Sequence, residues 1–229
     1  MTDSALQTEQ NPLIVIASNR GPFKFTQHEN GTFSSSRGAG GLVTALAAIA
    51  EKMDVLWVAS ALSEDDKAWA EEQEGHVRRV EGINLRMVVP EEEAYNKYYN
   101  AISNPLLWFI QHGLWDLARN PVIDRNIWDA WEEGYKAINQ QFAKTIADGV
   151  RQTLGDDETR PVIIFPQDYH MYLVPQYLRE ELGTRAQIQL FVHIPWPGPD
   201  GWRTLPREMR ETMLKSLLDC DRIGFQTSR

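Results

Sequence analysis

The sequence predicts an α/β fold built on a doubly wound, mostly parallel sheet. Three observations predict it: strand-like segments alternate with segments of helical periodicity, several strand-like segments are apolar throughout, and polar clusters follow their ends. A strand that is apolar along its whole length needs cover on both faces, which helices on the two sides of a parallel sheet provide. The expected strands are residues 13–18, 55–60, 86–89, 162–165, 188–192 and 222–225.

The segments between these strands contain helix signals. Apolar residues recur at helical spacing through residues 128–154, which predicts a long helix with one buried face. Ser63 before the acidic residues 64–66 is typical of a helix start, and Pro121 marks the expected end of another helical segment. The expected helices are residues 41–53, a helix that begins after Ser63, 91–120, 128–154, 172–182 and 207–218, and a loop or small hairpin is expected at residues 21–31.

Composition limits the class of protein. The 229 residues carry a formal net charge of −9, and because an acidic surface repels nucleic acid, no nucleic-acid partner is expected. Cys220 is the only cysteine, which excludes an intrachain disulfide and a cysteine-based zinc site and is typical of a reducing compartment. No run reaches the roughly 18 apolar residues of a membrane helix. We therefore expect a cytoplasmic protein without a membrane partner, with a disordered polar tail over residues 1–11 and one domain over residues 12–229.

Four clusters follow the expected strand ends, where ligands bind in open α/β sheets. They are Ser18-Asn19-Arg20, Gly38-Ala39-Gly40-Gly41, Pro166-Gln167-Asp168-Tyr169-His170, and His193.

Bare glycines at a helix start, here Gly40 and Gly41, let an anion or a sugar approach backbone N–H groups. A simple helix-capping turn is the alternative. A dinucleotide fingerprint is not expected, because Val43 stands at its third glycine position and Ser60 stands where a ribose-binding acid is needed.

Asp168 and His193 are polar residues at neighbouring strand ends, and prolines follow His193 at positions 195, 197 and 199. Proline restricts its own backbone and that of the preceding residue, so this segment predicts a stiff rim that holds His193 in place. A hydrogen-bonded structural histidine is the alternative. The spacing of Asp168, His170 and His193 resembles no standard metal site, so no metal is expected. Tyr98, Tyr99 and Trp108 suit either a sugar face or the packing of a helix against the core.

Several motifs in order resemble glycosyltransferase family 20, the family of trehalose-6-phosphate synthases. They are SNR near the N-terminus, GGL at a helix start, YYN-x-x-SN-x-x-LW, DYH, FVHIP-x-P, and LP before DRIGFQT, and they run from Leu13 to the C-terminus. The resemblance implies a GT-B architecture, two Rossmann-like domains with the active site between them. It implies that this chain is the N-terminal, acceptor-binding half, that the C-terminal nucleotide-sugar domain is absent from it, and that the isolated chain is inactive.

The resemblance also implies roles for individual residues. The arginine of SNR contacts the acceptor phosphate, the glycines approach the donor through their backbone, and Asp168 and His193 hold the reacting sugars as the candidate catalytic residues. The implied acceptor-binding residues are Arg20, Tyr99, Trp108 and Asp168, and the implied donor-binding residues are Gly40, Gly41 and His193.

The implied reaction transfers glucose from UDP-glucose to glucose 6-phosphate with retention, in trehalose biosynthesis, without a metal or another cofactor. Two positions depart from the family pattern: Ser60 stands where a tryptophan is usual, and Gln167 where a histidine is usual. The alternatives are therefore a family 20 enzyme with another acceptor, of the validoxylamine-phosphate or glucosylglycerol-phosphate synthase type, and a catalytically silent regulatory protein that binds a sugar phosphate. The oligomeric state is left open, with a homo-oligomer among the alternatives.

Overall fold

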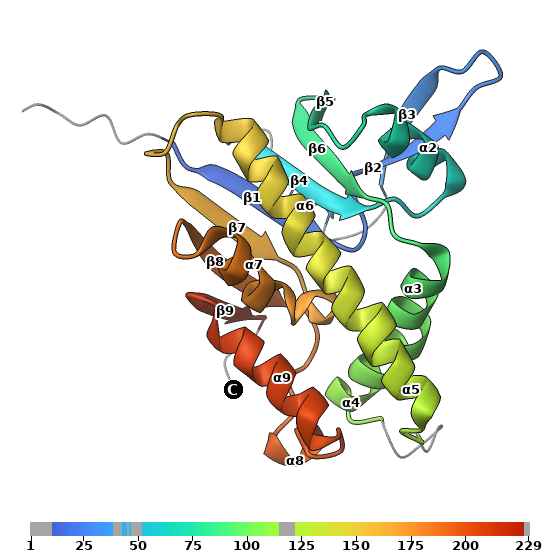
Figure 1. Cartoon of the computed structure of the whole chain (residues 1–229), viewed down its shortest axis with the longest axis vertical. Helices are drawn as coiled ribbons and strands as arrows, with labels where there is room; N and C mark the ends of the chain where they lie inside the picture. The colour runs from blue at the N-terminus through green and yellow to red at the C-terminus, as the bar shows by residue number, and fades with distance from the viewer. Residues whose placement is uncertain (1–10, 39–42, 45, 47–51, 115–121, 227–229) are drawn as a thin grey trace, which may run out of the picture.

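A seven-stranded sheet forms the centre of the computed structural model, which describes residues 11–38, 43, 44, 46, 52–114 and 122–226 (Figure 1). The strands lie in the order β5-β6-β4-β1-β7-β8-β9, and every neighbouring pair is parallel except β5 and β6. Their bounds are β1 (Leu13–Ser18), β4 (Val55–Ser60), β5 (Arg78–Val80), β6 (Ile83–Val88), β7 (Val162–Pro166), β8 (Ala186–Val192) and β9 (Arg222–Phe225).

The six parallel strands have the order of a Rossmann fold. Counted along the chain, they lie as third, second, first, fourth, fifth and sixth across the sheet. The chain builds outward from β1 through β4 to β6 and then returns to place β7 on the other side of β1. The switch point therefore lies between β1 and β7, and the crevice beyond their carboxyl ends is where a ligand is expected.

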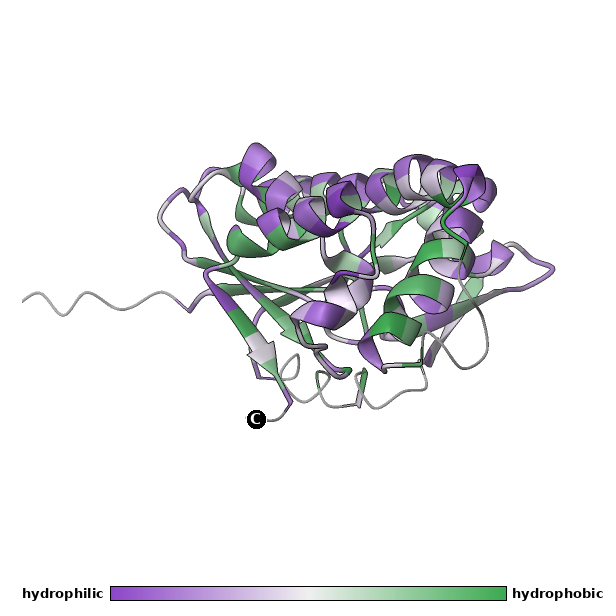
Figure 2. Ribbon diagram, turned by 90° about the horizontal axis from the view of Figure 1, so that it is seen from below, coloured by the Kyte–Doolittle hydropathy of each residue, from purple (hydrophilic) through white to green (hydrophobic). Residues whose placement is uncertain are grey.

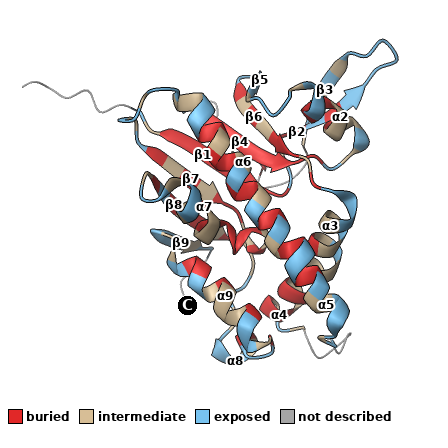
Figure 3. Ribbon diagram, viewed as in Figure 1, coloured by how far each residue is buried: buried red, intermediate tan, exposed pale blue. Residues whose placement is uncertain are grey.

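Both faces of the sheet are covered. Neighbouring residues of a strand point to opposite faces, so alternate residues of β1 belong to two different cores. Leu13, Val15 and Ala17 belong to the core beneath α6 (Ala137–Leu154), α7 (Val174–Leu182) and α9 (Arg207–Leu218). Figure 2 shows these helices layered over one side of the sheet. Ile14 and Ile16 pack on the opposite face with α2 (Glu64–Glu72) and the hairpin of β2 (Phe23–Gln27) and β3 (Phe33–Arg37). β1 and β4 are consequently buried along their whole length (Figure 3), which confirms the expected doubly wound sheet.

The helix predicted after Ser63 begins there through a capping box. Ser63 Oγ accepts from Asp66 N at 3.1 Å, and Asp66 Oδ2 accepts from Ser63 N at 3.0 Å. Asp66 Oδ1 also accepts from Phe25 N at 2.8 Å, so the same carboxylate attaches the hairpin to the helix.

The segment predicted as one helix over residues 91–120 differs from that prediction. Its described part, residues 91–114, consists of α3 (Glu92–Asn96), a π-helix η1 (Lys97–Trp108) and α4 (Phe109–Gln111). Within that part helical structure ends at Gln111, and residues 115–120 lie outside the described residues. Pro105 lies inside η1; it has no N–H to donate and excludes a regular α-helical turn, which favours the wider π geometry.

The helix predicted at 128–154 is also divided and begins earlier than expected. It comprises α5 (Arg125–Ala130), a second π-helix η2 (Trp131–Lys136) and α6. The two π-helices pack closely at Gly134, where a Cβ atom would lie 2.6 Å from Tyr98 N. Only glycine permits this approach, which brings η1 and η2 into direct contact.

The remaining strands and helices differ from the predictions in a few places. Strand β5 and the short helix α8 (Pro199–Trp202) were not predicted. Strand β6 begins at Ile83 rather than at residue 86, and its start was not predicted because polar residues alternate with apolar ones there. Of the predicted helix 41–53, residues 43, 44 and 46 are described as helical; Gly40, Gly41 and the predicted tail at residues 1–10 lie outside the described residues. In the part of the chain that the structure describes, no helix has the length and apolar character needed to span a bilayer.

Candidate functional site

Asp168 and His193 meet beyond the carboxyl ends of β7 and β8, as the sequence predicts. Asp168 Oδ1 accepts from the backbone N of His193 at 3.2 Å, and Asp168 N donates to Phe191 O at 2.7 Å. Burial raises the pKa of the Asp168 carboxyl, although the backbone N–H groups of Tyr169 and His193 oppose the rise. Burial lowers the pKa of His193, opposed by the charge of Asp168, so the imidazole favours its neutral form.

The backbone of Asp168 is strained. Its φ of 69° and ψ of −178° lie in a region that is almost restricted to glycine. The strain is maintained by the hydrogen bonds to Phe191 on β8 and to His193 directly after it, and by η3 (Tyr169–Met171), which begins at the next residue. Tyr135 Oη supports η3 from the core by donating to Tyr169 O at 2.6 Å. Strained residues of this kind are concentrated at functional sites.

We expect Asp168→Gly to be more stable than Asp168→Ala by about 1–2 kcal/mol, because both variants lose the carboxylate but only glycine relieves the strain. The free energies of unfolding in urea measure the difference. The same two substitutions at Asp129, inside α5, should give the opposite order by about 1 kcal/mol. Equal stabilities at position 168 would show that the conformation is not strained.

An aromatic stack lies beside this pair. The rings of Tyr95 and Tyr99 are 5.7 Å apart, those of Tyr99 and His170 are 5.8 Å apart, and those of His170 and Tyr169 are 4.0 Å apart. Tyr99 therefore lies where a sugar site was predicted, whereas Tyr98 is fully buried in the core. Neither Tyr95 nor the stacking role of His170 was predicted. Tyr95 could have been found from its position one helical turn before Tyr99, and His170 from its position next to Tyr169.

Arg20 is an exposed cation next to the stack. Burial lowers the pKa of His170 to about 3, and the positive charge of Arg20 adds to this effect. The same charge opposes the rise in pKa that burial causes in Tyr95 and Tyr169. Within the described residues no carboxylate forms an ion pair with Arg20. Its backbone is fixed because Ser18 Oγ donates to Arg20 O at 2.7 Å. The guanidinium is therefore available to an anion.

The remaining predicted aromatic residue, Trp108, stacks on His112 with ring centroids 3.9 Å apart. The charge of His112 is among the causes that favour the ionised form of Asp168, and the ring contacts of Trp108 within the described residues are with His112 and Phe109. His112 was not predicted, because no strand end or motif marks it in the sequence. The structure thus brings Arg20, Tyr99, Asp168 and His193 to one edge of the sheet.

Ser60 extends the polar edge from β4. It is 2% exposed, and its Oγ donates to Asn19 Oδ1 at 3.4 Å. Asn19 in turn exchanges hydrogen bonds with Tyr95 Oη at 3.1 and 3.2 Å.

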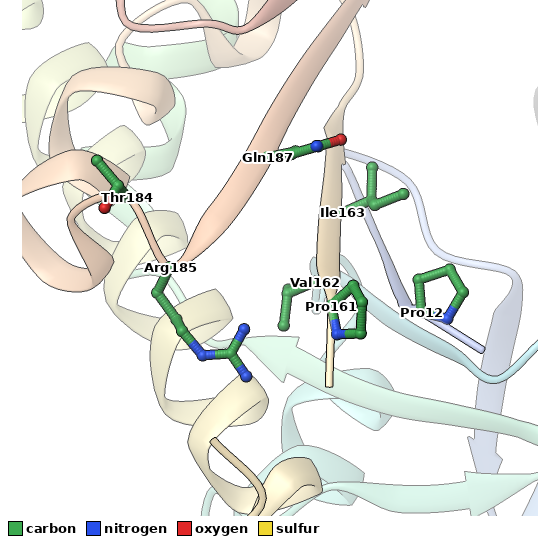
Figure 4. Close-up of a pocket in the computed structure, with 7 residues that line it drawn as sticks. All are labelled: Pro12, Pro161, Val162, Ile163, Thr184, Arg185 and Gln187. Carbon is green, nitrogen blue, oxygen red and sulfur yellow. The ribbon is translucent and has the colours of Figure 1, made fainter. Parts of the chain in front are cut away.

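A hollow of about 500 Å³ lies at the opposite edge of the sheet, next to the amino ends of β7 and β8 (Figure 4). The guanidinium of Arg185 lines it, but donates to Arg160 O at 2.7 Å and is already occupied. This hollow contains none of the predicted residues and is not the candidate site. Among the described residues, no group of three or more His, Cys, Asp or Glu side chains could hold a metal ion.

The model of glycosyltransferase family 20 matches residues 12–229. The chain belongs to glycosyltransferase family 20. Two curated relatives of this family 20 chain are named as UDP-forming alpha,alpha-trehalose-phosphate synthases. The protein from Botryotinia fuckeliana is 34% identical over 93% of this chain and 38% of its own length, and that from Schizosaccharomyces pombe is 30% identical over 93% and 39%.

The fold of the family 20 chain agrees with that of a solved structure. An E. coli protein bound with UDP-2-fluoro glucose matches with a TM-score of 0.66 and 26% identity, over 94% of this chain and 40% of the E. coli chain. The expected fold class, the Rossmann-like half of a GT-B glycosyltransferase, is confirmed. The chain spans about two fifths of the length of these relatives.

Proposed function

We propose that this family 20 domain binds a sugar phosphate, and that the whole protein transfers glucose from UDP-glucose to glucose 6-phosphate with retention, forming trehalose 6-phosphate. The observation that carries the proposal is Arg20, a cation without an ion-pair partner among the described residues, beside the aromatic stack at the switch point. A guanidinium suits a phosphate because it donates two parallel hydrogen bonds. The curated relatives named above support the choice of acceptor and donor.

The residues have distinct roles in this proposal. Arg20 binds the acceptor phosphate, and Tyr99 and Trp108 present aromatic surfaces to the acceptor sugar. Asp168 accepts hydrogen bonds from sugar hydroxyls, and His193 contacts the donor sugar. Gly40 and Gly41, outside the described residues, admit the donor to the backbone.

The transfer itself needs positioning and charge stabilisation rather than a protein nucleophile. The acceptor hydroxyl attacks from the face that the nucleotide leaves, and an oxygen of the leaving phosphate takes the proton. We propose that no metal ion or other cofactor takes part, and that the protein is cytoplasmic, in keeping with its single cysteine.

A second candidate function is transfer to an acceptor other than glucose 6-phosphate. Ser60 favours it, because its hydroxyl and Asn19 place a small polar network at the end of β4, where the family pattern has a large aromatic ring. The two candidates differ in the acceptor sugar and share the phosphate site at Arg20. Turnover by the whole protein with a panel of phosphorylated acceptors separates them.

Arg20→Ala is expected to weaken the binding of glucose 6-phosphate by about 1–3 kcal/mol, because a charge-assisted hydrogen bond to the phosphate is lost. Calorimetric titration with glucose 6-phosphate, and with glucose as the unphosphorylated control, measures the change. Arg125→Ala is the matched control, since Arg125 is a highly exposed arginine on α5. Equal affinities of Arg20→Ala and the unsubstituted protein would remove Arg20 from the site and contradict the proposal.

A further inference from the structure

Gln167 lies directly behind the candidate site, and its side-chain amide has one possible orientation. Phe165 O, a carbonyl oxygen that can only accept, lies 3.0 Å from one end of the amide, so that end is the donor nitrogen Nε2. The amide oxygen Oε1 therefore faces the imidazole of His193, 2.8 Å from its Nε2 atom.

This orientation determines where the imidazole carries its proton. Because Oε1 of Gln167 can only accept, Nε2 of His193 must donate. Burial favours the neutral imidazole, and a neutral ring protonated at Nε2 has a lone pair on Nδ1. No hydrogen bond from a described residue reaches Nδ1, and Nδ1 is not among the buried ring nitrogens without a partner, so solvent or a ligand can reach it.

Gln167 is held firmly enough to impose this choice. It is 4% exposed, and its backbone N donates to Ala17 O on β1 at 2.9 Å. It also bridges to Phe191 on β8, so three neighbouring strands determine its position. Asp168 is the charged group that faces His193 most closely, but its Oδ1 accepts from the backbone of His193, so it does not compete with Gln167 for the ring proton.

We infer that Gln167 is a positioning residue that holds neutral His193 as the Nε2–H tautomer and thereby presents Nδ1 as a hydrogen-bond acceptor at the switch-point edge of the sheet. An acceptor atom selects a ligand group that donates, which is a hydroxyl of a sugar. The oxygens of a phosphate or diphosphate only accept, so Nδ1 disfavours them. The choice of ligand group rests on the proposed function; the tautomer and its cause do not.

Nuclear magnetic resonance of the imidazole nitrogens tests the inference. The chain has five histidines, and the spectrum of His193→Gln identifies the signals of His193 in protein labelled with 15N-histidine. Long-range 1H–15N correlation near neutral pH should show the Nε2–H tautomer, with a ring proton that exchanges slowly. In Gln167→Met, which has a similar shape and replaces the amide oxygen by a thioether that accepts only weakly, exchange of that proton should be faster by about fivefold or more. Gln187→Met is the matched control, because Gln187 is an exposed glutamine at the other end of β8, and its spectrum should be unchanged.

An Nδ1–H tautomer in the unsubstituted protein would overturn the inference, as would an unchanged exchange rate in Gln167→Met. If Gln167→Met does not fold, Gln167→Glu provides the second test. Its carboxylate accepts from Nε2–H, so the slow proton should remain and the ring should gain its second proton at a higher pH; loss of the slow proton would contradict the inference. These measurements contain no substrate, so their outcome is independent of the titration that tests Arg20.

Discussion

Asp66→Ala is expected to lower the free energy of unfolding by about 3 kcal/mol. The Asp66 side chain is 5% exposed and accepts from three backbone N–H groups, those of Phe25 at 2.8 Å, Leu62 at 3.3 Å and Ser63 at 3.0 Å. Alanine leaves these donors without a partner in a place that water reaches poorly, which is more costly than the loss of ordinary surface hydrogen bonds. Because one of the donors belongs to β2, the hairpin should loosen together with the start of α2. Urea denaturation measures the loss.

Asp65→Ala is the matched control, since Asp65 occupies the same first turn and adds only its favourable interaction with the helix dipole. Its cost should stay below about 1 kcal/mol. Asp66→Asn retains one acceptor and should fall between the two. Similar losses for Asp65→Ala and Asp66→Ala would mean that charge at the helix start, rather than the three hydrogen bonds, accounts for the stability.

Acid should destabilise the protein through His170. Burial, assisted by Arg20, lowers the pKa of His170 to about 3 in the folded protein, whereas a histidine in the unfolded chain titrates near 6.5. The unfolded chain therefore binds the proton more readily, and stability falls as the pH falls from about 6.5 towards 3. Between pH 7 and pH 4 this group should lower the free energy of unfolding by about 3 kcal/mol.

His170→Phe isolates this effect. Phenylalanine keeps the ring in the stack with Tyr99 and removes the titrating nitrogens. No described residue forms a hydrogen bond with the His170 ring, and its Nε2 is buried without a partner, so no ring hydrogen bond is broken. We expect a shallower loss of stability below pH 6.5 than in the unsubstituted protein. Equal slopes for His170→Phe and the unsubstituted protein would show that the histidine is hydrated and titrates normally.

Local features of the chain were predictable because their causes are local. The apolar segments 13–18 and 55–60 have to be buried strands, and Ser63 with Asp66 defines a helix start from two residues three positions apart. The division of 91–120 into α- and π-helical parts was not predicted, because the close packing of η1 against Gly134 involves residues far apart in the sequence. The roles of Gly40 and Gly41 remain predictions.

The fold class, the family motifs and the identity of the strand-end residues Arg20, Asp168 and His193 follow from the order of residues along the chain. The neighbours of each strand, and therefore the meeting of the end of β1 with the end of β7, were established by the folded structure. It alone brought His170 into a stack with Tyr99 and oriented the Gln167 amide towards His193. The physical reason is that periodicity depends on which face of an element a residue occupies, whereas strand order, ring stacking and amide orientation depend on partners that the linear sequence does not specify.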